Sequence, residues 1–142
     1  MEIKVKVNFD FGKLARELPK VIKKYTSNYA KGAEEGSKAN INNGTGVDGK
    51  PLTPLRSSTL ALRKAKGNNS VKPLIETGAL LDSIKSKDNV LSMKGYGKKQ
   101  NDGFQPPFGV FAVARPFIST TAKDKKKLDK QFSEDIRKAL RK

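Results

Sequence analysis

Two stretches of the 142-residue chain, one near each end, have the apolar spacing of amphipathic helices. This feature most constrains the fold, because a helix with one apolar face needs another element to cover it. The second stretch follows Thr121, a residue type that often caps a helix N-terminus. The apolar residues recur at three- and four-residue steps: Leu14, Leu18, Val21, Ile22, Tyr25 and Tyr29 in the first stretch, and Leu128, Phe132, Ile136, Ala139 and Leu140 in the second. Core packing of these faces is the expected outcome.

Pro19 interrupts the first of these stretches. Proline lacks a backbone N–H, and its ring clashes with the preceding helical turn. The sequence therefore predicts a short helix over 11–18 and a longer helix from Pro19 to about Ile41, with the proline in its first turn. Gly32 and Gly36 weaken the far end of the longer helix, because glycine loses more backbone entropy than other residues on folding.

Glycine, proline and asparagine divide the middle of the chain into short elements. Two long loops are expected, over 42–54 and 94–107. The other expected elements are an alternating strand over 2–9, a helix over roughly 57–65 capped by Ser57, Ser58 or Thr59, a short turn or helix over 79–84, and strands over 89–93 and 108–114. The predicted fold is a single α+β domain over 1–142. It has an N-terminal strand and helices, a small antiparallel sheet with long loops, and a C-terminal amphipathic helix.

The residue inventory excludes much catalytic chemistry. The chain has no Cys and no His, so it has no disulfide, no thiolate or imidazole metal site, no Cys nucleophile and no His-based triad. Adjacent acids such as Glu34–Glu35 and Glu134–Asp135 point in different directions on a helix, so they do not form a catalytic dyad. We expect these acids to lie on the solvated surface. The sequence therefore predicts no enzyme, no catalytic residue, no metal and no cofactor.

The formal net charge of +16 limits the choice of partners. The excess is spread along the chain, and residues 50–75 hold six bases and no acid. Such a chain could bind nucleic acid through its phosphates, or it could contact acidic protein neighbours. Most of the bases are lysines and aromatic residues are few, which disfavours sequence-specific recognition. A small nonspecific nucleic-acid-binding protein is thus one functional alternative.

Nothing in the chain resembles a membrane span or a signal-peptide core. The absence of cysteine also suits a reducing compartment. The glycines of the 42–54 loop do not make a phosphate-binding loop, because no Gly-Lys-Ser/Thr ending follows them. We therefore expect a protein without a membrane partner.

Three segments of the middle and late chain occur in a characteristic order. In order and spacing they resemble the phage virion morphogenesis family, the tail-completion or neck proteins of tailed bacteriophages. The residues that carry this resemblance are Gly49, Pro51, Pro54 and Leu55 in the first segment, Leu74, Thr77, Gly78, Leu80, Ser83 and Ile84 in the second, and Arg115, Pro116 and Phe117 in the third. From the residues alone, Pro116 is expected to end a strand and Phe117 to pack under the last helix, with a partner contact at residues 115–118 as the less favoured alternative.

The resemblance implies a structural role without catalysis. It implies a virion protein at the head–tail junction that is assembled in the host cytoplasm as a homo-oligomer, often a ring. Its partners would be the portal or adaptor and the tail tube or terminator proteins, with nonspecific contact to phage DNA as a further possibility. A role as a minor tail component is an alternative. The long loops over 42–54 and 94–107 would then be contact arms that order on assembly.

Overall fold

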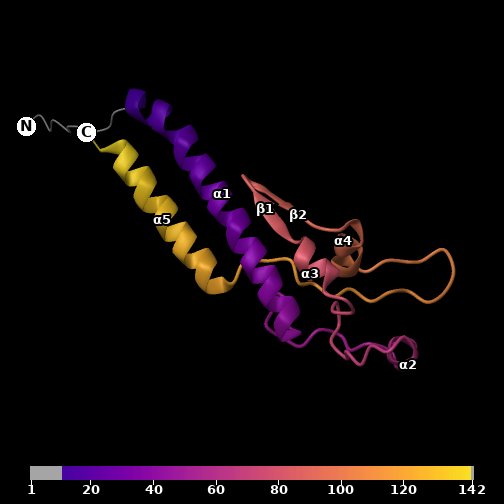
Figure 1. Cartoon of the computed structure of the whole chain (residues 1–142). Coiled ribbons are helices and arrows are strands. Elements are labelled where there is room, and N and C mark those ends of the chain that lie inside the picture. The colour runs from indigo at the N-terminus through magenta and orange to yellow at the C-terminus, as the bar shows by residue number, and fades with distance from the viewer. Residues whose placement is uncertain (1–10, 142) are drawn as a thin grey trace, which may run out of the picture.

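The computed structural model describes residues 11–141, so the expected strand over 2–9 lies outside the described residues. Helix α1 (Phe11–Asn43) is the central element of the α+β fold. Helix α5 (Ala122–Leu140) runs antiparallel along one side of α1, and a β-hairpin lies along the other side (Figure 1). The remaining short helices gather near the C-terminal end of α1.

Helix α1 runs through Pro19 without interruption, so the expectation of two separate helices is wrong. Pro19 is exposed, which keeps its ring away from the packed face of the helix. Proline removes one backbone hydrogen bond, but the apolar stripe continues on both sides of it. Packing of that stripe against α5 outweighs the local cost, as is common for helices in folded proteins.

The two long helices are joined by an aromatic contact and by polar pairs. The rings of Tyr25 and Phe132 have centroids 4.5 Å apart. The Tyr25 hydroxyl donates to Asp129 Oδ1 at 2.8 Å, and Lys24 Nζ donates to Asp135 Oδ2 at 2.8 Å. At the start of α5, the Thr121 hydroxyl accepts a hydrogen bond from the backbone N–H of Asp124, so the predicted cap is confirmed. Contrary to expectation, Asp135 is half-buried at this helix interface.

Within residues 11–141 the sheet consists of two short antiparallel strands. Strand β1 (Lys85–Lys87) pairs with β2 (Val90–Ser92), and Ser86 lies opposite Leu91. The expected strand over 89–93 is thus confirmed with tighter bounds. Strand β1 was not expected, because Lys-Ser-Lys shows no apolar alternation. Only Ser86 of this strand is half-buried, and its other two residues are exposed.

Two expectations for residues 94–114 are wrong. Residues Gly95–Asp102 form helix α4 rather than a loop. Helix α4 is held by tertiary contact: Gly97 is buried, and a Cβ there would lie within 3 Å of the Leu80 and Met93 side chains. Residues 108–114 form no strand, because the described chain offers them no continuous partner strand. In this part of the described chain, Phe104 and Ala112 form one isolated antiparallel β-bridge.

The expectations for the other short elements hold more closely. Helix α2 (Ser57–Ala65) matches the expected range, but its N-cap is Arg56 and no side chain caps it. Helix α3 (Ala79–Ser83) also lies where a short helix was expected. The loop after α1 begins at residue 44, and its main internal contact is a β-bridge between Thr45 and Pro51. The bounds of these short helices thus follow from local sequence signals. The N-cap of α2 and the bridge in the loop after α1 do not.

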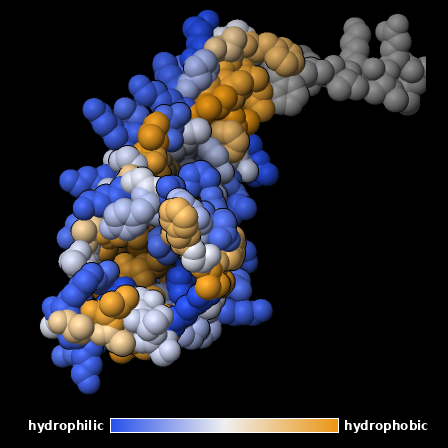
Figure 2. All heavy atoms as spheres, turned by 90° about the vertical axis from the view of Figure 1, so that its right-hand side faces the viewer, coloured by the Kyte–Doolittle hydropathy of each residue, from blue (hydrophilic) through white to orange (hydrophobic). Residues whose placement is uncertain are grey.

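A small core lies near the C-terminal end of α1. Ile41, Leu80, Ile84 and Phe117 form a buried cluster, with partly buried apolar side chains around it. Elsewhere, large apolar side chains remain exposed, and Figure 2 shows apolar surface among hydrophilic residues around a hollow. No helix in the described part of the chain is long and apolar enough to span a membrane.

Candidate functional site

The three segments that carry the family resemblance meet at the C-terminal end of α1. Arg115, in the third segment, joins the first segment through its guanidinium. Its Nε donates to the Thr53 carbonyl at 2.9 Å and its Nη2 to the Pro54 carbonyl at 3.1 Å. The backbone N–H of Arg115 donates to the Gln100 carbonyl of α4 at 2.9 Å. Arg115 therefore connects the third segment to helix α4 and to the first segment, which lies 61 or more residues earlier in the chain.

The second and third segments share the core. Leu80, Ile84 and Phe117 belong to the buried cluster described above, together with Ile41 of α1. No residue of α5 belongs to this cluster, so the expectation that Phe117 packs under the last helix is wrong. Pro116 ends no strand, because residues 108–115 directly before it form none. The side chains of these segments therefore build the fold at this end of α1.

Asparagine side chains hold the third segment in place. Asn101 Oδ1, in α4, accepts hydrogen bonds from the backbone N–H groups of Phe117 and Ile118, each at 3.0 Å. Asn40 Nδ2, in α1, donates to the Phe117 carbonyl at 3.0 Å. These bonds satisfy the backbone beside a fully buried ring, where an unpaired group would be costly.

Several other motif residues set local backbone geometry. Gly78 has a φ of 81° and precedes α3, and Leu74 has a φ of 66°. Thr77 Oγ1 accepts from the backbone N–H of Ala79 at 3.3 Å. Ser83 Oγ donates to the Leu80 carbonyl at 2.7 Å and accepts from the backbone N–H of Lys94 at 3.1 Å. These residues thus have structural contacts of their own.

In the first segment, Gly49 has a φ of 75° in a tight turn, and its N–H donates to the Gly46 carbonyl at 3.0 Å. Pro51 bridges to Thr45, and the Pro54 carbonyl accepts from Arg115. Leu55 lines a cleft between α2 and the third segment. The first segment therefore connects the turn at Gly49 to the Arg115 junction and the cleft.

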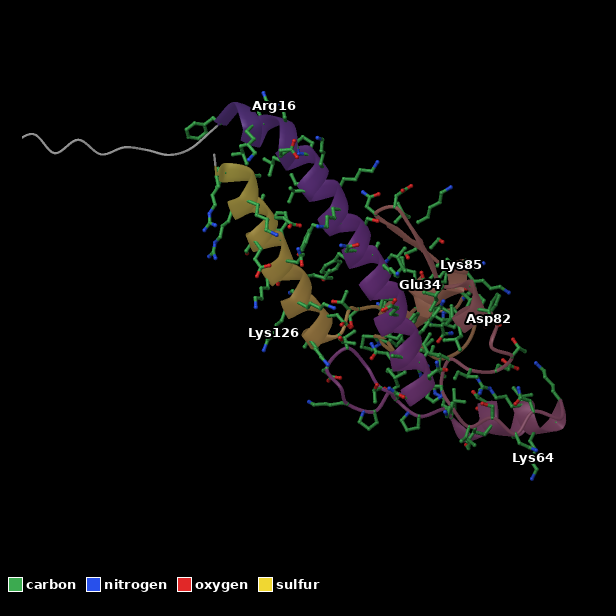
Figure 3. The ribbon with its side chains drawn as sticks, turned by 60° about the vertical axis from the view of Figure 1, so that its left-hand side comes forward. Arg16, Glu34, Lys64, Asp82, Lys85 and Lys126 are labelled. Carbon is green, nitrogen blue, oxygen red and sulfur yellow. The ribbon has the colours of Figure 1, made fainter. Side chains whose placement is uncertain are left out.

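Glu34 is another junction, and the expectation that it lies on the solvated surface is wrong. Its Oε2 accepts from the backbone N–H and the hydroxyl of Ser86, each at 2.7 Å, and its Oε1 accepts from Lys38 Nζ at 2.7 Å. These bonds, that of Lys38 first and those of Ser86 next, lower the pKa of Glu34 to about 2. Glu34 faces the hairpin from α1 (Figure 3), whereas its neighbour Glu35 is exposed.

The most prominent surface feature is an apolar loop, residues 103–114, which we call the arm. It extends away from the rest of the molecule on the side opposite α5 (Figure 1). Phe104 and Ala112 exchange two backbone hydrogen bonds, of 3.0 and 2.8 Å, at its base. Towards its tip, Phe108 is 94% exposed and Val110 is 67% exposed. Exposed large apolar side chains gathered on one loop are typical of contact surfaces in proteins.

The second half of the arm, residues 110–113, forms one wall of the cleft. The cleft has a volume of about 470 Å³ and lies between the arm, α2, α4 and the second segment. Its walls carry three arginines, Arg56, Arg63 and Arg115, and one acid, Glu76. Sequence reasoning noted the acid-free charge over 50–75 but missed this cleft. The available signal was the spacing of Arg56 and Arg63, seven residues apart, which is two helical turns.

The acidic side chains of the described residues do not gather into a metal centre. Residues 11–141 contain no cluster of three or more acidic side chains that could hold a metal ion. The chain has no significant match among protein-family models, curated proteins or solved structures. The features of this chain that bear on function are therefore its surface, its charge and the three segments.

Proposed function

We propose that this protein is a structural subunit of the head–tail junction of a tailed phage, a neck or tail-completion protein. It acts by assembling into a homo-oligomer and by contacting the portal or adaptor and tail proteins, and it catalyses no reaction. The resemblance of the three segments supports the assignment to this family and to the head–tail junction. Their meeting at Arg115 and around Phe117 supports the idea that they define one structural unit.

The single observation that carries an assembly role is the exposed apolar arm. Phe108 and Val110 are largely exposed, while the described part of the chain buries only a small cluster of large apolar side chains. Burying one such side chain stabilises an interface by roughly 1.5–3 kcal/mol. A subunit with this distribution gains more from association than a chain whose apolar residues are already internal.

The arm replaces the contact loops expected from the sequence. The loop expected over 94–107 is partly α4, and the protruding residues are 103–114 instead. The loop after α1 is held by its own bridge and by the bond from the Val47 N–H to the Pro116 carbonyl at 3.0 Å. We therefore assign assembly contacts to the arm before the 42–54 loop.

The test is native mass spectrometry of the purified full chain, alone and with the neighbouring structural proteins of its phage, at two salt concentrations. We expect a ring or a stoichiometric complex. The variant Phe108→Ser should weaken that assembly about tenfold or more, because it removes the most exposed apolar side chain of the arm. The matched control is Val71→Ser, which changes a loop valine that is 68% exposed outside the arm.

Two results would contradict the proposal. One is a chain that stays monomeric and ignores the phage proteins at both salt concentrations. The other is an assembly that Phe108→Ser and Val71→Ser weaken equally, because the arm would then have no special part in it.

A second candidate is nonspecific nucleic-acid binding, and the surface of α5 favours it. Lys123, Lys125, Lys126, Lys127 and Lys130 are all exposed on this helix. Such a surface can bind phosphates in a strongly salt-dependent way. A monomer that binds duplex DNA at low salt and loses it as salt rises, without entering any phage complex, would favour this candidate.

A further inference from the structure

The cleft beside the arm holds three arginines that lack an acidic partner. In the part of the chain that the structure describes, every salt bridge has a lysine as its cation. Arg56 Nη2 donates to the Phe111 carbonyl at 3.3 Å, and Arg115 donates to the Thr53 and Pro54 carbonyls. These acceptors are neutral backbone groups, so they satisfy N–H groups without neutralising the charges.

Arg63 is the most buried of the three, with 6% of its surface exposed. Its Nη1 donates to the carbonyls of Ser70, Lys72 and Ile75, at 3.1, 3.0 and 2.9 Å. Its Nε is buried and makes no hydrogen bond. A buried guanidinium with an unused donor and no counter-charge is costly, and an anion entering the cleft would offset that cost.

The three charges also act on one another. Burial lowers the pKa of Arg115, and repulsion from Arg56 and then Arg63 lowers it further. Glu76 is the one acid in the lining, but its side chain is 46% exposed and lies 3.9 Å from Lys66 Nζ. The local field therefore favours an added negative charge.

The rest of the lining combines apolar side chains with the polar side chains of Thr59, Thr77, Tyr96 and Gln100. Leu55, Leu74, Val110, Phe111 and Val113 face the same cleft, and the lining contains no lysine. A carboxylate can form two parallel hydrogen bonds with one arginine. Apolar walls favour the burial of an apolar side chain next to that carboxylate on the same bound segment. A nucleic-acid backbone supplies the charge but no apolar group for these walls. The exposed lysines of α5 suit phosphates better.

We propose that this cleft binds an acidic segment of a neighbouring protein, one in which aspartate or glutamate alternates with large apolar residues. The inference rests on the proposed function, because it names the chemistry of a segment of the assembly partner that would bind beside the arm. The volume of about 470 Å³ lies within the usual range of ligand sites.

The first test uses fluorescence anisotropy with the full chain at 150 mM salt, a concentration that screens long-range attraction. The probe is a labelled eight-residue peptide that alternates Glu and Leu. Two comparison peptides alternate Gln with Leu, which removes the charge, and Glu with Ser, which removes the apolar side chains. We expect the Glu-Leu peptide to bind about tenfold more tightly than either comparison peptide.

The informative substitution is Arg56→Ala, because Arg56 is exposed and makes a single long hydrogen bond to the arm. It should weaken binding of the Glu-Leu peptide about tenfold. The matched control is Arg16→Ala, an exposed arginine near the other end of α1, far from α2 (Figure 3). This control should weaken binding by less than about twofold, the loss expected from net charge alone.

A second measurement needs no substitution in the cleft. The Nε–H resonance of Arg63 should shift during the peptide titration and saturate with the same dissociation constant as the anisotropy signal. A saturated peptide that leaves this resonance unmoved would overturn the inference, because the peptide would then lie elsewhere. Equal binding of the Glu-Ser peptide, or equal losses for Arg56→Ala and Arg16→Ala, would also overturn it.

A 20-base-pair duplex is the remaining probe. If the duplex displaces the peptide and Arg56→Ala weakens duplex binding more than Arg16→Ala does, the cleft is a phosphate site and the acidic-segment inference is wrong. Assembly through the arm without Arg56-dependent peptide binding would refute this inference alone. Peptide binding by a chain that never assembles would refute the proposed function alone.

Discussion

At Gly36 the backbone of α1 comes into close contact with the segment that enters α5. A Cβ at this position would overlap the carbonyl oxygen of Ser119 and would lie 3.1 Å from Thr120 Cα and Thr121 N. These neighbours are backbone atoms, which cannot move aside as a flexible side chain can. Gly36 therefore does more than weaken the helix, because its missing side chain lets the two segments approach.

We expect Gly36→Ala to destabilise the protein by about 1–3 kcal/mol, the usual cost of forcing extra atoms into a packed site. The control is Gly32→Ala, one turn earlier in α1, where the nearest atom to a new Cβ is Thr120 Cγ2 at 3.4 Å. That change should be neutral or stabilising, because alanine favours a helix. Urea unfolding followed by circular dichroism measures both. Equal effects of the two variants would argue against a backbone clash at Gly36.

Glu34 links α1 to β1, and its contribution to stability should depend on pH. Its pKa is lowered to about 2 in the folded protein, below the ordinary value near 4.3. Because the folded pKa is the lower one, the stabilisation is present above the unfolded value and is lost as pH falls from about 5 towards 2. We expect Glu34→Gln to cost roughly 1–2 kcal/mol at pH 7.

The measurement is the unfolding midpoint of wild type and Glu34→Gln between pH 7 and pH 3. The difference between the unfolding midpoints of the two proteins should become smaller as the pH falls. Glu35→Gln, at the exposed neighbouring position, should show almost no gap at any pH. A constant gap for Glu34→Gln would show that the ionised carboxylate is not the stabilising form.

At the scale of single elements, α1 shows how packing overrides a local break. Its 33 residues include Pro19, and the helix continues because its apolar face packs on α5 along much of its length. Packing also holds α4 together, although two glycines and one asparagine among its eight residues favour a loop. Contact with Leu80 and Met93, and the hydrogen bonds that Asn101 Oδ1 accepts from the third segment, hold α4 in place.

We expect Pro19→Ala to stabilise the protein by about 1–2 kcal/mol. The change restores a backbone hydrogen bond and removes the ring clash, while the greater freedom of the unfolded chain offsets part of the gain. Pro19 is exposed, so no core contact is lost. Thermal unfolding followed at 222 nm measures the effect. A lower midpoint for the variant would show that the proline relieves strain in α1 rather than causing it.

At the scale of the whole molecule, the net charge of +16 acts on stability as well as on partners. The described chain pairs few of its lysines, so repulsion between like charges opposes the folded state. We expect stability to rise as sodium chloride increases from about 20 to 200 mM, because salt screens that repulsion. Thermal unfolding at several salt concentrations measures this. A falling midpoint would show that the ion pairs outweigh the repulsion.

The sequence alone determined the elements whose signals are local. The apolar stripe and the Thr121 cap predicted α5, and short patterns predicted α2, α3 and β2 with nearly correct bounds. The three motif segments were also visible in the sequence, since order and spacing need no coordinates. These signals depend on neighbours within a few residues, which is the range over which a sequence pattern carries structural information.

Only the tertiary structure decided the rest. It made α1 one helix, turned an expected loop into α4, and left residues 108–114 without a partner strand. It also placed Arg56 and Arg63 beside Arg115, more than 50 residues away, to form the cleft. Each of these outcomes depends on contacts between distant residues, and burial and backbone hydrogen bonds gained there exceed the local preferences of the chain.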